Sequence, residues 1–315
     1  MLREFRRRDA EQLFPLLERH FPAENRLLGF RPEAFQRIVH QLFRPHLRFL
    51  MGLADVVHRP FAKFLVIEAD GHLAATTLLT FTPTTGYVSM VMVDDAYRRR
   101  GFAKRLLEAA ARETKRAGRS WVVLDVLSDN VPAKRLYDGI GYETLATMEF
   151  RSAELSGPAP PGPAPPLPEG VRALRRSDGD ALTTLADAER PERYRRVLPA
   201  YPRQFFVSPL VAMGLESETE AWVIDRGRGP EGFVRATVSP ATEAGNLTVP
   251  LIGPDVPPEL ARGLVAWAMD WVHRRGPTRL ATEVPEYAVR GAAALTSAGF
   301  TSQFTSDTMA LALHG

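Results

Sequence analysis

Short apolar runs that predict strands alternate with helical periodicity through the first half of this 315-residue chain. Two such runs, residues 64–69 and 74–82, flank the dipeptide Asp70-Gly71, which favours a tight hairpin turn. A third run, residues 88–93, leads into a predicted helix. Apolar residues of that helix recur every three to four positions, at Phe102, Leu106, Leu107 and Ala110. Antiparallel strands followed by a strand–helix–strand–helix unit are therefore expected.

The region before these strands is predicted to be mainly helical. Residues 2–7 are expected to form a first strand, and residues 9–19 a helix that turns its leucines inward. Residues 21–59 predict a longer helical segment that breaks near Pro45. Four of the seven histidines lie in this region, at positions 20, 40, 46 and 58. Their spacing fits no metal-ligand motif, so we interpret them as pocket-wall or surface residues and expect no metal.

Proline dominates residues 156–170, where it alternates mainly with alanine and glycine. Such a segment prefers an extended polyproline conformation, about 3.1 Å per residue, and acts as a semi-rigid spacer. A polyproline ligand for a partner domain is the alternative. Because 315 residues are long for one domain and natural for two, we predict an N-terminal domain at residues 1–155 and a C-terminal domain at residues 171–315.

The C-terminal domain repeats the pattern of the first. Residues 171–178 resemble residues 2–9, and a constant shift of 158 pairs the strand predicted at residues 121–126 with residues 279–284. A second copy of the same fold is therefore expected.

Composition excludes several classes of protein. Hydrophobic residues make up 45% of the chain and charged residues 24%, which is ordinary for a globular protein, and no apolar run approaches the length of a membrane span. No export signal is found at the N-terminus, so a cytoplasmic location without membrane partners is expected. The chain lacks cysteine, which excludes disulfides and a cysteine nucleophile. The net charge of +3 is spread along the chain, so no nucleic-acid partner is expected.

A basic, glycine-bearing loop separates the third predicted strand from the helix that follows it. Arg98, Arg99 and Arg100 precede Gly101, and Lys104 follows it. The first N–H groups of a helix lack intrahelical partners and carry partial positive charge, so the loop predicts an anion site that suits pyrophosphate. The glycine patterns of a Walker loop and of a dinucleotide-binding turn are both missing. A solvated basic helix start stays an alternative.

A second strand–loop–helix block follows at residues 121–142. Asp125 lies in its strand, and the Asn130 side chain is placed either to cap the following helix or to bond a ligand. Tyr137 shares the apolar face of that helix.

Together the two blocks resemble the GNAT superfamily of acetyl-CoA-dependent N-acetyltransferases. The family's phosphate loop corresponds here to Val93, Asp95, Arg98, Gly101 and Ala103. The family's second block corresponds to Asn130, Ala133, Leu136, Tyr137, Gly141 and Tyr142. Asp95 stands in place of the usual proline, and Ala103 in place of the last glycine.

The resemblance implies an α/β (α+β) fold with two GNAT-like domains, each a mixed, mostly antiparallel sheet flanked by helices. It also implies acetyl-CoA as the acyl-donor substrate. The donor-binding residues that it implies are Val91, Met92, Val93, Arg98, Arg99, Arg100, Gly101, Phe102, Ala103, Lys104 and Asn130. The strand residues would pair with the pantetheine arm, the loop would wrap the pyrophosphate, and the backbone N–H near Val91 would face the thioester oxygen.

Two residues match catalytic positions of the family. Tyr137 matches the general acid that protonates the coenzyme A thiolate, and its alternative is an aromatic residue of the helix core. Asp125 occupies the strand position of a catalytic glutamate in ribosomal-protein N-terminal acetyltransferases, where it would accept the amine proton directly or through water. A structural salt bridge explains Asp125 equally well, and a water chain is the alternative to a dedicated base.

The second copy lacks these residues. The shift of 158 places Val256 at Arg98, Glu259 at Gly101, Ala288 at Asn130 and Leu295 at Tyr137. A carboxylate at Glu259 would repel phosphate, so this copy is not expected to bind acetyl-CoA in the usual way. It is expected to buttress the first domain or to close its acceptor cleft.

The chain is therefore expected to be an N-acetyltransferase that transfers an acetyl group from acetyl-CoA to an amine by direct attack in a ternary complex. A non-catalytic acyl-CoA sensor or scaffold and an acyltransferase for a different acyl-CoA are the alternatives. The acceptor is expected to be a small-molecule or peptide amine. Neither its identity nor the oligomeric state follows from the sequence.

Overall fold

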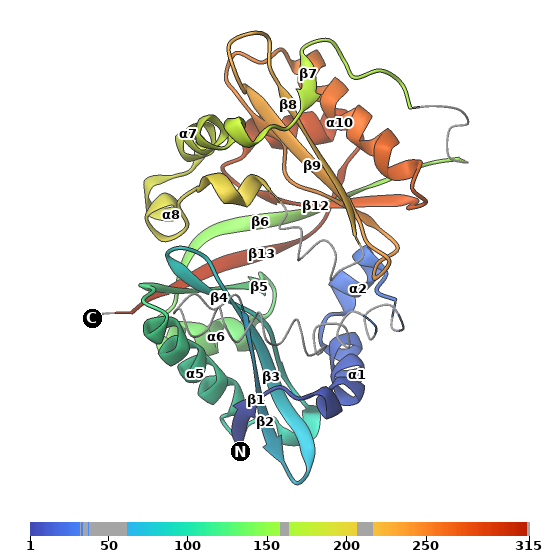
Figure 1. The fold of residues 1–315 in the computed structure, drawn as a ribbon. Coiled ribbons are helices and arrows are strands. Elements are labelled where there is room, and N and C mark those ends of the chain that lie inside the picture. The colour runs from blue at the N-terminus through green and yellow to red at the C-terminus, as the bar shows by residue number, and fades with distance from the viewer. Residues whose placement is uncertain (32, 34–36, 38–61, 158–163, 207–216, 314–315) are drawn as a thin grey trace. The chain divides into compact units, whose positions relative to one another are not determined.

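The computed structural model describes residues 1–31, 33, 37, 62–157, 164–206 and 217–313 (Figure 1). Most of the helical segment predicted at residues 21–59 lies outside these residues, together with three of its histidines. The described chain has a mixed α/β fold with mostly antiparallel strand pairing, which confirms the predicted fold class. It divides into two compact units.

Unit 1 comprises Met1–Pro22, Pro32–Thr147 and Ser306–Gly315. Its strands, in order across the sheet, are β1 (Leu2–Glu4), β2 (Ala62–Ala69), β3 (His72–Phe81), β4 (Thr85–Val93), β5 (Trp121–Leu127) and the second half of β13 (Thr301–Ala312). Neighbours pair antiparallel except β4 and β5, which are parallel. Its described helices include α1 (Ala10–His20), α5 (Phe102–Arg116) and α6 (Val131–Ile140), with 3-10 turns at Arg7–Asp9 and Asp95–Tyr97.

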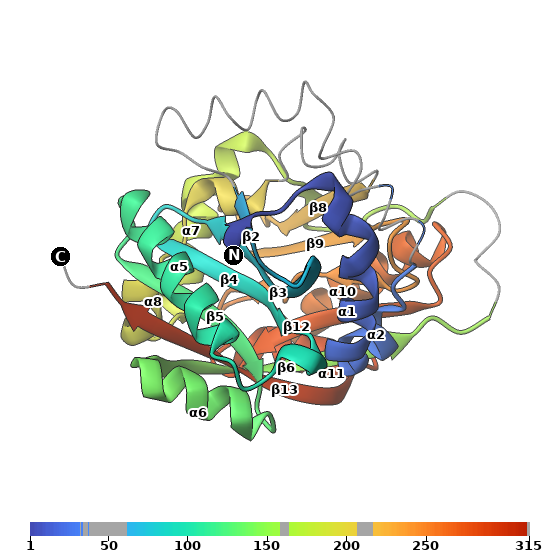
Figure 2. The ribbon, with the colours of Figure 1, turned by 90° about the horizontal axis from the view of Figure 1, so that it is seen from below.

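Helices cover both faces of the unit 1 sheet (Figure 2). Side chains alternate along β2, so Val66 packs in the α1 cluster, whereas Leu65 and Ile67 pack against α5. Helix α6 lies on the same face as α5, because Tyr137 shares a core cluster with Leu107. We call these two surfaces the α1 face and the α5 face.

The predicted hairpin between β2 and β3 is confirmed. Asp70 and Gly71 have φ angles of 52° and 78°, and the strands pair antiparallel on either side. Positive φ at both central residues is the geometry of a type I′ turn, which matches the twist of the flanking strands.

Unit 2 comprises Ala23–Arg31 and Met148–Thr305. Its strands, in order across the sheet, are β7 (Val171–Ala173), β8 (Glu218–Ile224), β9 (Gly232–Val238), β10 (Gly245–Leu247), β12 (Arg279–Pro285) and most of β6 (Glu143–Glu154), while β11 (Leu251–Ile252) also pairs with β9. The described helices include most of α2 (Pro22–Leu28), α7 (Gly179–Glu189), α8 (Glu192–Val197), α10 (Pro258–His273) and α11 (Val289–Ser297), with 3-10 turns at Arg176–Asp178 and Pro202–Phe205.

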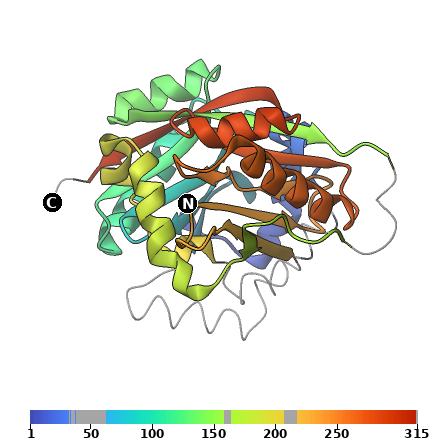
Figure 3. The same cartoon turned by 90° about the horizontal axis from the view of Figure 1, so that it is seen from above.

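The unit 2 sheet is also covered on both faces, by α7 and by α10 (Figure 3). Phe233 of β9 packs with Leu182 of α7, whereas the next residue, Val234, packs with Leu264 of α10. The parallel pair β10–β12 has the place that β4–β5 has in unit 1.

A buried ion pair occurs in the same form near the start of each half of the chain. The Arg3 guanidinium donates to both carboxylate oxygens of Asp9, at 2.6 and 2.8 Å. The Arg172 guanidinium donates to Asp178 in the same way, at 2.8 and 2.9 Å. Each carboxylate also accepts a backbone N–H three residues before it, at 2.7 Å. The recurrence of this arrangement supports the duplication inferred from the sequence.

The compact units are not the contiguous ranges 1–155 and 171–315. Residues 148–155 belong to unit 2 because β6 pairs there with β12, and residues 306–315 belong to unit 1 because β13 pairs there with β5. Residues 23–31 also join unit 2. Each half of the chain thus contributes a strand to the other unit. The described parts of the proline-rich segment contain neither helix nor strand.

Candidate active site

Strand β4 is bulged at its C-terminal end. Met90 has a φ of 55°, and the register with β3 shifts between Thr76 and Leu78. A bulge adds one residue to one strand and changes which face the following side chains point to. Val88 accordingly packs on the α5 face before the bulge, and Met92 packs with α1 after it.

The two parallel strands separate where the bulge begins. The pairing of β4 with β5 ends at Val88 and Leu124. Beyond this point β5 pairs only with β13, as far as Leu127, and β4 pairs only with β3, among the described residues. The predicted donor-binding residues Val91, Met92 and Val93 lie in the unpaired stretch of this edge.

The basic loop ends at the N-terminus of α5, as predicted. Gly101 is the N-cap residue with a φ of 76°, and Arg99 also has a positive φ, of 62°. Both values lie in the left-handed region that favours glycine. A Cβ at Gly101 would meet no atom within 4 Å, so the space in front of the helix is open.

The side chains of the loop are largely solvent-exposed. Arg98, Arg99, Arg100 and Lys104 are exposed, and Phe102 and Ala103 are partly buried. Arg98 pairs with Asp95 at 2.7 Å, and the Arg100 guanidinium lies 5.1 Å from the centre of the Tyr97 ring. Exposed pairs of this kind contribute little energy, so the cations stay accessible to an anion at the helix N-terminus.

Helix α1 holds the end of β4 in a way that sequence reasoning missed. The His20 Nε2 atom lies 2.8 Å from the Val93 carbonyl oxygen, and the Arg19 guanidinium donates to Asp94 at 2.9 Å. Burial, and next the nearby Arg98, lower the pKa of His20, so the ring is neutral and able to donate to the carbonyl. Only the position of these residues at the end of the predicted helix could have suggested this contact.

Asn130 caps helix α6. Its side-chain oxygen accepts the Ala133 N–H at 3.2 Å. Of the two roles that the sequence allowed for this side chain, the structure shows the cap.

Tyr137 is buried in the core between α6 and the sheet. It is 6% exposed, and its ring centre lies 5.8 Å from that of Tyr142. Burial raises the pKa of Tyr137 to about 12, so the hydroxyl keeps its proton at neutral pH. The position is consistent both with a proton donor and with a core aromatic residue.

Asp125 lies on the other face of the sheet. Its neighbours Leu124 and Val126 pack with Tyr137 on the α5 face, so strand alternation turns the Asp125 carboxylate to the α1 face. Thr308 of β13 donates to one carboxylate oxygen at 2.6 Å, and the Tyr87 hydroxyl donates to the other. The side chain is solvent-accessible, but the surrounding protein desolvates it and raises its pKa to about 6.

No basic residue pairs with Asp125 among the described residues, so the salt bridge considered from the sequence is not found there. Thr308 follows Asp125 by 183 positions. No local signal links these residues, because the contact depends on the strand that the C-terminal half contributes to unit 1.

The strand that corresponds to β4 in unit 2 lacks the matching donor. The shift of 158 matches Leu280 of unit 2 with Val122 of unit 1. Gly245 pairs with Leu280, and Gly86 pairs with Val122, so Gly245 corresponds to Gly86. Five residues further along, Val91 of unit 1 is replaced by Pro250, which has no N–H.

Helix α11 closes the corresponding space in unit 2. A Cβ at Gly291 would lie 2.2 Å from the Pro250 carbonyl oxygen, so the helix packs directly on this backbone. Ala288 begins that helix without a side-chain cap, and Leu295 is fully buried. These contacts support the prediction that the second copy does not bind acetyl-CoA in the usual way.

No cluster of three or more His, Cys, Asp or Glu side chains among the described residues could hold a metal ion. None of the described helices is long and apolar enough to span a membrane.

Known acetyltransferases resemble this chain in sequence and in fold. Residues 17–142 match the sequence profile of the acetyltransferase (GNAT) family. The whole chain superposes on a GCN5-related N-acetyltransferase from Sphaerobacter thermophilus, with a TM-score of 0.64, 18% identity and coverage of 96% of that chain. It also superposes on a tandem GNAT protein from the clavulanic acid biosynthesis pathway, with a TM-score of 0.61, 15% identity and coverage of 99% of that chain. Residues 17–142 thus resemble the GNAT acetyltransferase family, and the whole chain has the fold of these GNAT proteins, one of them a tandem protein.

A shorter match involves the first unit. Over 89 residues the chain is 27% identical to a Bacillus subtilis (strain 168) protein named putative ribosomal protein bS18-alanine N-acetyltransferase. This match covers 28% of the present chain and 59% of that relative.

Proposed function

We propose that unit 1 transfers an acetyl group from acetyl-CoA to an amine by direct attack in a ternary complex. The observation that carries the proposal is the separation of β4 from β5 beyond Val88, next to the exposed basic loop at the N-terminus of α5. Asp125 and Tyr137 lie on opposite faces of the sheet beside this opening. This arrangement supports a proton acceptor for the amine on one face of the sheet and a proton donor for the departing thiolate on the other.

The residues present fit the acyl donor. The loop offers the accessible guanidinium groups of Arg98, Arg99 and Arg100 and the free N–H groups of a helix start, which together suit a pyrophosphate. Gly101 leaves this space open, and the bulge at Met90 frees β4 from β5 just before Val91. When bound, coenzyme A supplies the thioester, and the backbone near Val91 would face its carbonyl oxygen.

Asp125 is suited to accept a proton from the amine. With a pKa raised to about 6 it is deprotonated at neutral pH, yet it is more basic than an ordinary aspartate. The hydroxyl donors Tyr87 and Thr308 fix its orientation. The amine must lose a proton as the new amide bond forms, and the accessible carboxylate on the α1 face can receive it.

Tyr137 is suited to the opposite task. Its raised pKa keeps the phenol protonated, and α6 holds it on the α5 face. A proton delivered from this side would neutralise the departing thiolate as the carbon–sulfur bond breaks. The buried environment also fits an acyl-CoA sensor without turnover, in which Tyr137 is a core residue; a measurement of turnover separates the two functions.

The acceptor is proposed to be a small-molecule or peptide amine. The Bacillus subtilis relative is named for an alanine N-acetyltransferase of a ribosomal protein, which favours tests with peptide α-amines beside small amines. The second alternative, a longer acyl chain, is tested by comparing the affinities of acetyl-CoA and longer acyl-CoA esters.

Calorimetric titration of the full chain with coenzyme A tests the donor site. Replacing Arg98 and Arg100 together by Gln should weaken binding at least ten-fold, and this loss should shrink as the salt concentration rises. The control is Arg116→Gln, which removes an exposed charge at the other end of α5. Release of free thiol from acetyl-CoA with a panel of amines then measures transfer. Absence of coenzyme A binding to the wild type would refute the proposed enzyme.

A further inference from the structure

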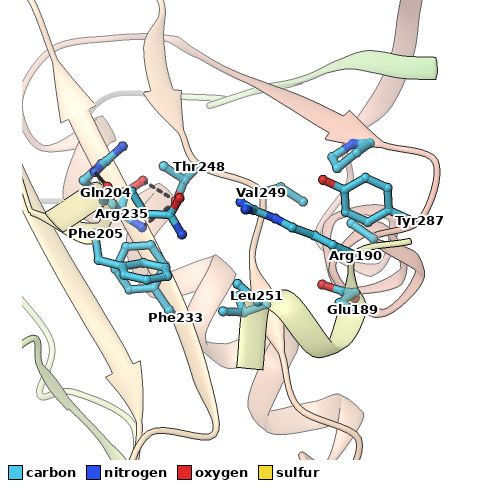
Figure 4. Close-up of a pocket in the computed structure, with 13 residues that line it drawn as sticks. Glu189, Arg190, Gln204, Phe205, Phe233, Arg235, Thr248, Val249, Leu251 and Tyr287 are labelled. Carbon is cyan, nitrogen blue, oxygen red and sulfur yellow. Dashed lines mark hydrogen bonds between the residues drawn. The ribbon is translucent and has the colours of Figure 1, made fainter. Parts of the chain in front are cut away.

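Unit 2 contains a pocket of its own, on the sheet face that α7 covers (Figure 4). Its volume is about 210 Å³. Phe205, Phe233 and Leu251 form much of its apolar wall, and the two rings meet edge to face with centres 5.2 Å apart. Two arginines, Arg190 and Arg235, line the same pocket.

Arg235 carries a partly buried charge that no carboxylate neutralises among the described residues. Its guanidinium donates to the Gln204 carbonyl oxygen at 3.1 Å. Desolvation by the surrounding protein lowers the pKa of Arg235, which shows that the environment disfavours the cation. A charge in such a position costs stability unless a partner compensates it.

The position is specific to unit 2. Ile67 of unit 1 and Ile224 of unit 2 have matching positions in their strands. Leu78 lies three residues beyond the residue that pairs with Ile67, and Arg235 lies three residues beyond the residue that pairs with Ile224. Arg235 therefore has the position in unit 2 that Leu78 has in unit 1. An apolar side chain on the α1 face of unit 1 is thus replaced by a cation on the α7 face of unit 2. Two hydrogen bonds of 2.9 Å hold the backbone of Arg235 in its strand. The Arg235 carbonyl oxygen accepts from the Thr248 N–H, and the Arg235 N–H donates to the Thr248 hydroxyl oxygen.

Arg190 enters the pocket from the opposite wall, at the end of α7, and Figure 4 shows its guanidinium directed towards that of Arg235. It donates to the Leu198 carbonyl oxygen at 2.9 Å and lies 3.9 Å from Asp187. Burial raises the pKa of Tyr201, and the charges of Arg190 and Arg235 both oppose this rise. This shared effect agrees with the two guanidinium groups lying close together.

One carboxylate, that of Glu189, also lines the pocket. It lies 3.8 Å from Arg290, and burial raises its pKa, with Arg290 and Arg190 acting in the opposite direction. In Figure 4 it lies near Tyr287, away from Arg235. The end of the pocket between the two arginines therefore keeps a positive character.

We propose that this pocket binds a small carboxylic acid with an apolar body, whose carboxylate lies between Arg235 and Arg190. A guanidinium forms paired, charge-assisted hydrogen bonds with a planar carboxylate, and the phenylalanine and leucine walls receive the apolar part. Ligand pockets usually measure about 300–1,000 Å³, so this smaller volume selects a small ligand. The site lies within unit 2 and does not depend on the acetyl transfer proposed for unit 1.

Calorimetric titration of the full chain with benzoate and with 3-methylbutanoate tests the carboxylate. Both should bind, whereas the neutral isostere benzamide should bind at least ten-fold more weakly than benzoate. Arg235→Gln should weaken benzoate binding at least ten-fold, and Arg190→Gln should also weaken it. Arg262→Gln, an exposed charge on α10, is the control and should leave the affinity unchanged.

Thermal unfolding without ligand separates binding from folding. Because no carboxylate of the described residues pairs with Arg235, the variant should unfold at the same temperature as the wild type or at a higher one. The proposal is overturned if neither acid binds the wild type, if benzamide binds as well as benzoate, or if Arg235→Gln binds benzoate unchanged. Inorganic phosphate that binds as tightly as the two acids would also overturn it, since that would show a simple anion site.

Discussion

Replacing Asp125 by Asn tests the proposed base, because this change removes the charge and preserves the shape. The carboxylate accepts hydrogen bonds from Thr308 and Tyr87, and the hydroxyl groups of both residues can rotate to meet an amide. The substitution should therefore leave the sheet intact. Two effects are expected: a slower transfer of the acetyl group, and a more stable protein at high pH.

The stability effect follows from the raised pKa. A rise from 3.8 to about 6 corresponds to about 3 kcal/mol if fully expressed. Asp125 is solvent-accessible, so screening reduces this figure to about 1–2 kcal/mol. As the pH rises, the unfolded chain loses the Asp125 proton first, and the folded state loses it near pH 6. The loss of folding stability caused by the desolvated Asp125 charge is thus absent below pH 3.8 and fully present above about pH 6.

Denaturant unfolding at pH 4 and pH 8 measures this difference. Asp125→Asn should match the wild type at pH 4 and exceed it by about 1–2 kcal/mol at pH 8. Glu143→Gln, which removes an exposed carboxylate at the start of β6, is the control and should show no such pH dependence. A variant that is equally destabilised at both pH values would show that Asp125 has a structural role and that its pKa is not raised.

The catalytic effect is measured with acetyl-CoA and a responsive amine. Wild-type kcat/KM should fall about ten-fold between pH 7 and pH 5 as Asp125 becomes protonated, beyond any loss due to the amine. The acceptor's own titration affects wild type and variant equally, so the ratio of their rates isolates Asp125. A ratio that stays constant with pH would remove Asp125 as the base and favour a water chain.

Four further substitutions test other parts of unit 1 and the duplicated scaffold. Tyr137→Phe should lower turnover by about 10²–10⁴ with an unchanged coenzyme A affinity, and unchanged turnover would leave Tyr137 a core residue. Gly101→Ala should cost about 1 kcal/mol of stability and weaken coenzyme A binding in calorimetry, because φ is 76° there. Asp9→Ala and Asp178→Ala should each cost about 3 kcal/mol in denaturant unfolding at pH 7. Both carboxyl pKa values are lowered, so this advantage of the wild type should persist above pH 3.8 and disappear as the pH falls through the folded-state pKa.

Local sequence signals predicted the features that depend on neighbouring residues. The Asp70-Gly71 turn, the start of α5 directly after Gly101 and the cap at Asn130 each follow from the preferences of one or two residues. These elements were predictable because their stabilising contacts lie within a few positions.

The exchanged strands were not predictable in the same way. Strand β6 pairs with β12 and β13 pairs with β5, and in each case the partner lies more than a hundred residues away, so no local signal selects the sheet. The partners of Asp125 depend on this exchange through Thr308. The domain boundaries drawn at the proline-rich segment therefore separate the chain in sequence, whereas the compact units exchange residues on both sides of it.

The duplicated scaffold explains how the two units could acquire different chemistry. Both keep the buried Arg–Asp pair and the parallel strand pair, so the sheet survives. In unit 2 the N–H that matches Val91 is lost at Pro250, and Gly291 lets α11 contact this backbone. The shift of 158 aligns Gly291 with Ala133, whose methyl group would clash at that distance, so α6 must stay farther from β4. One glycine–proline pair thus closes in unit 2 the space that corresponds to the proposed acyl-donor site of unit 1, while the opposite face of the unit 2 sheet carries a cation, Arg235.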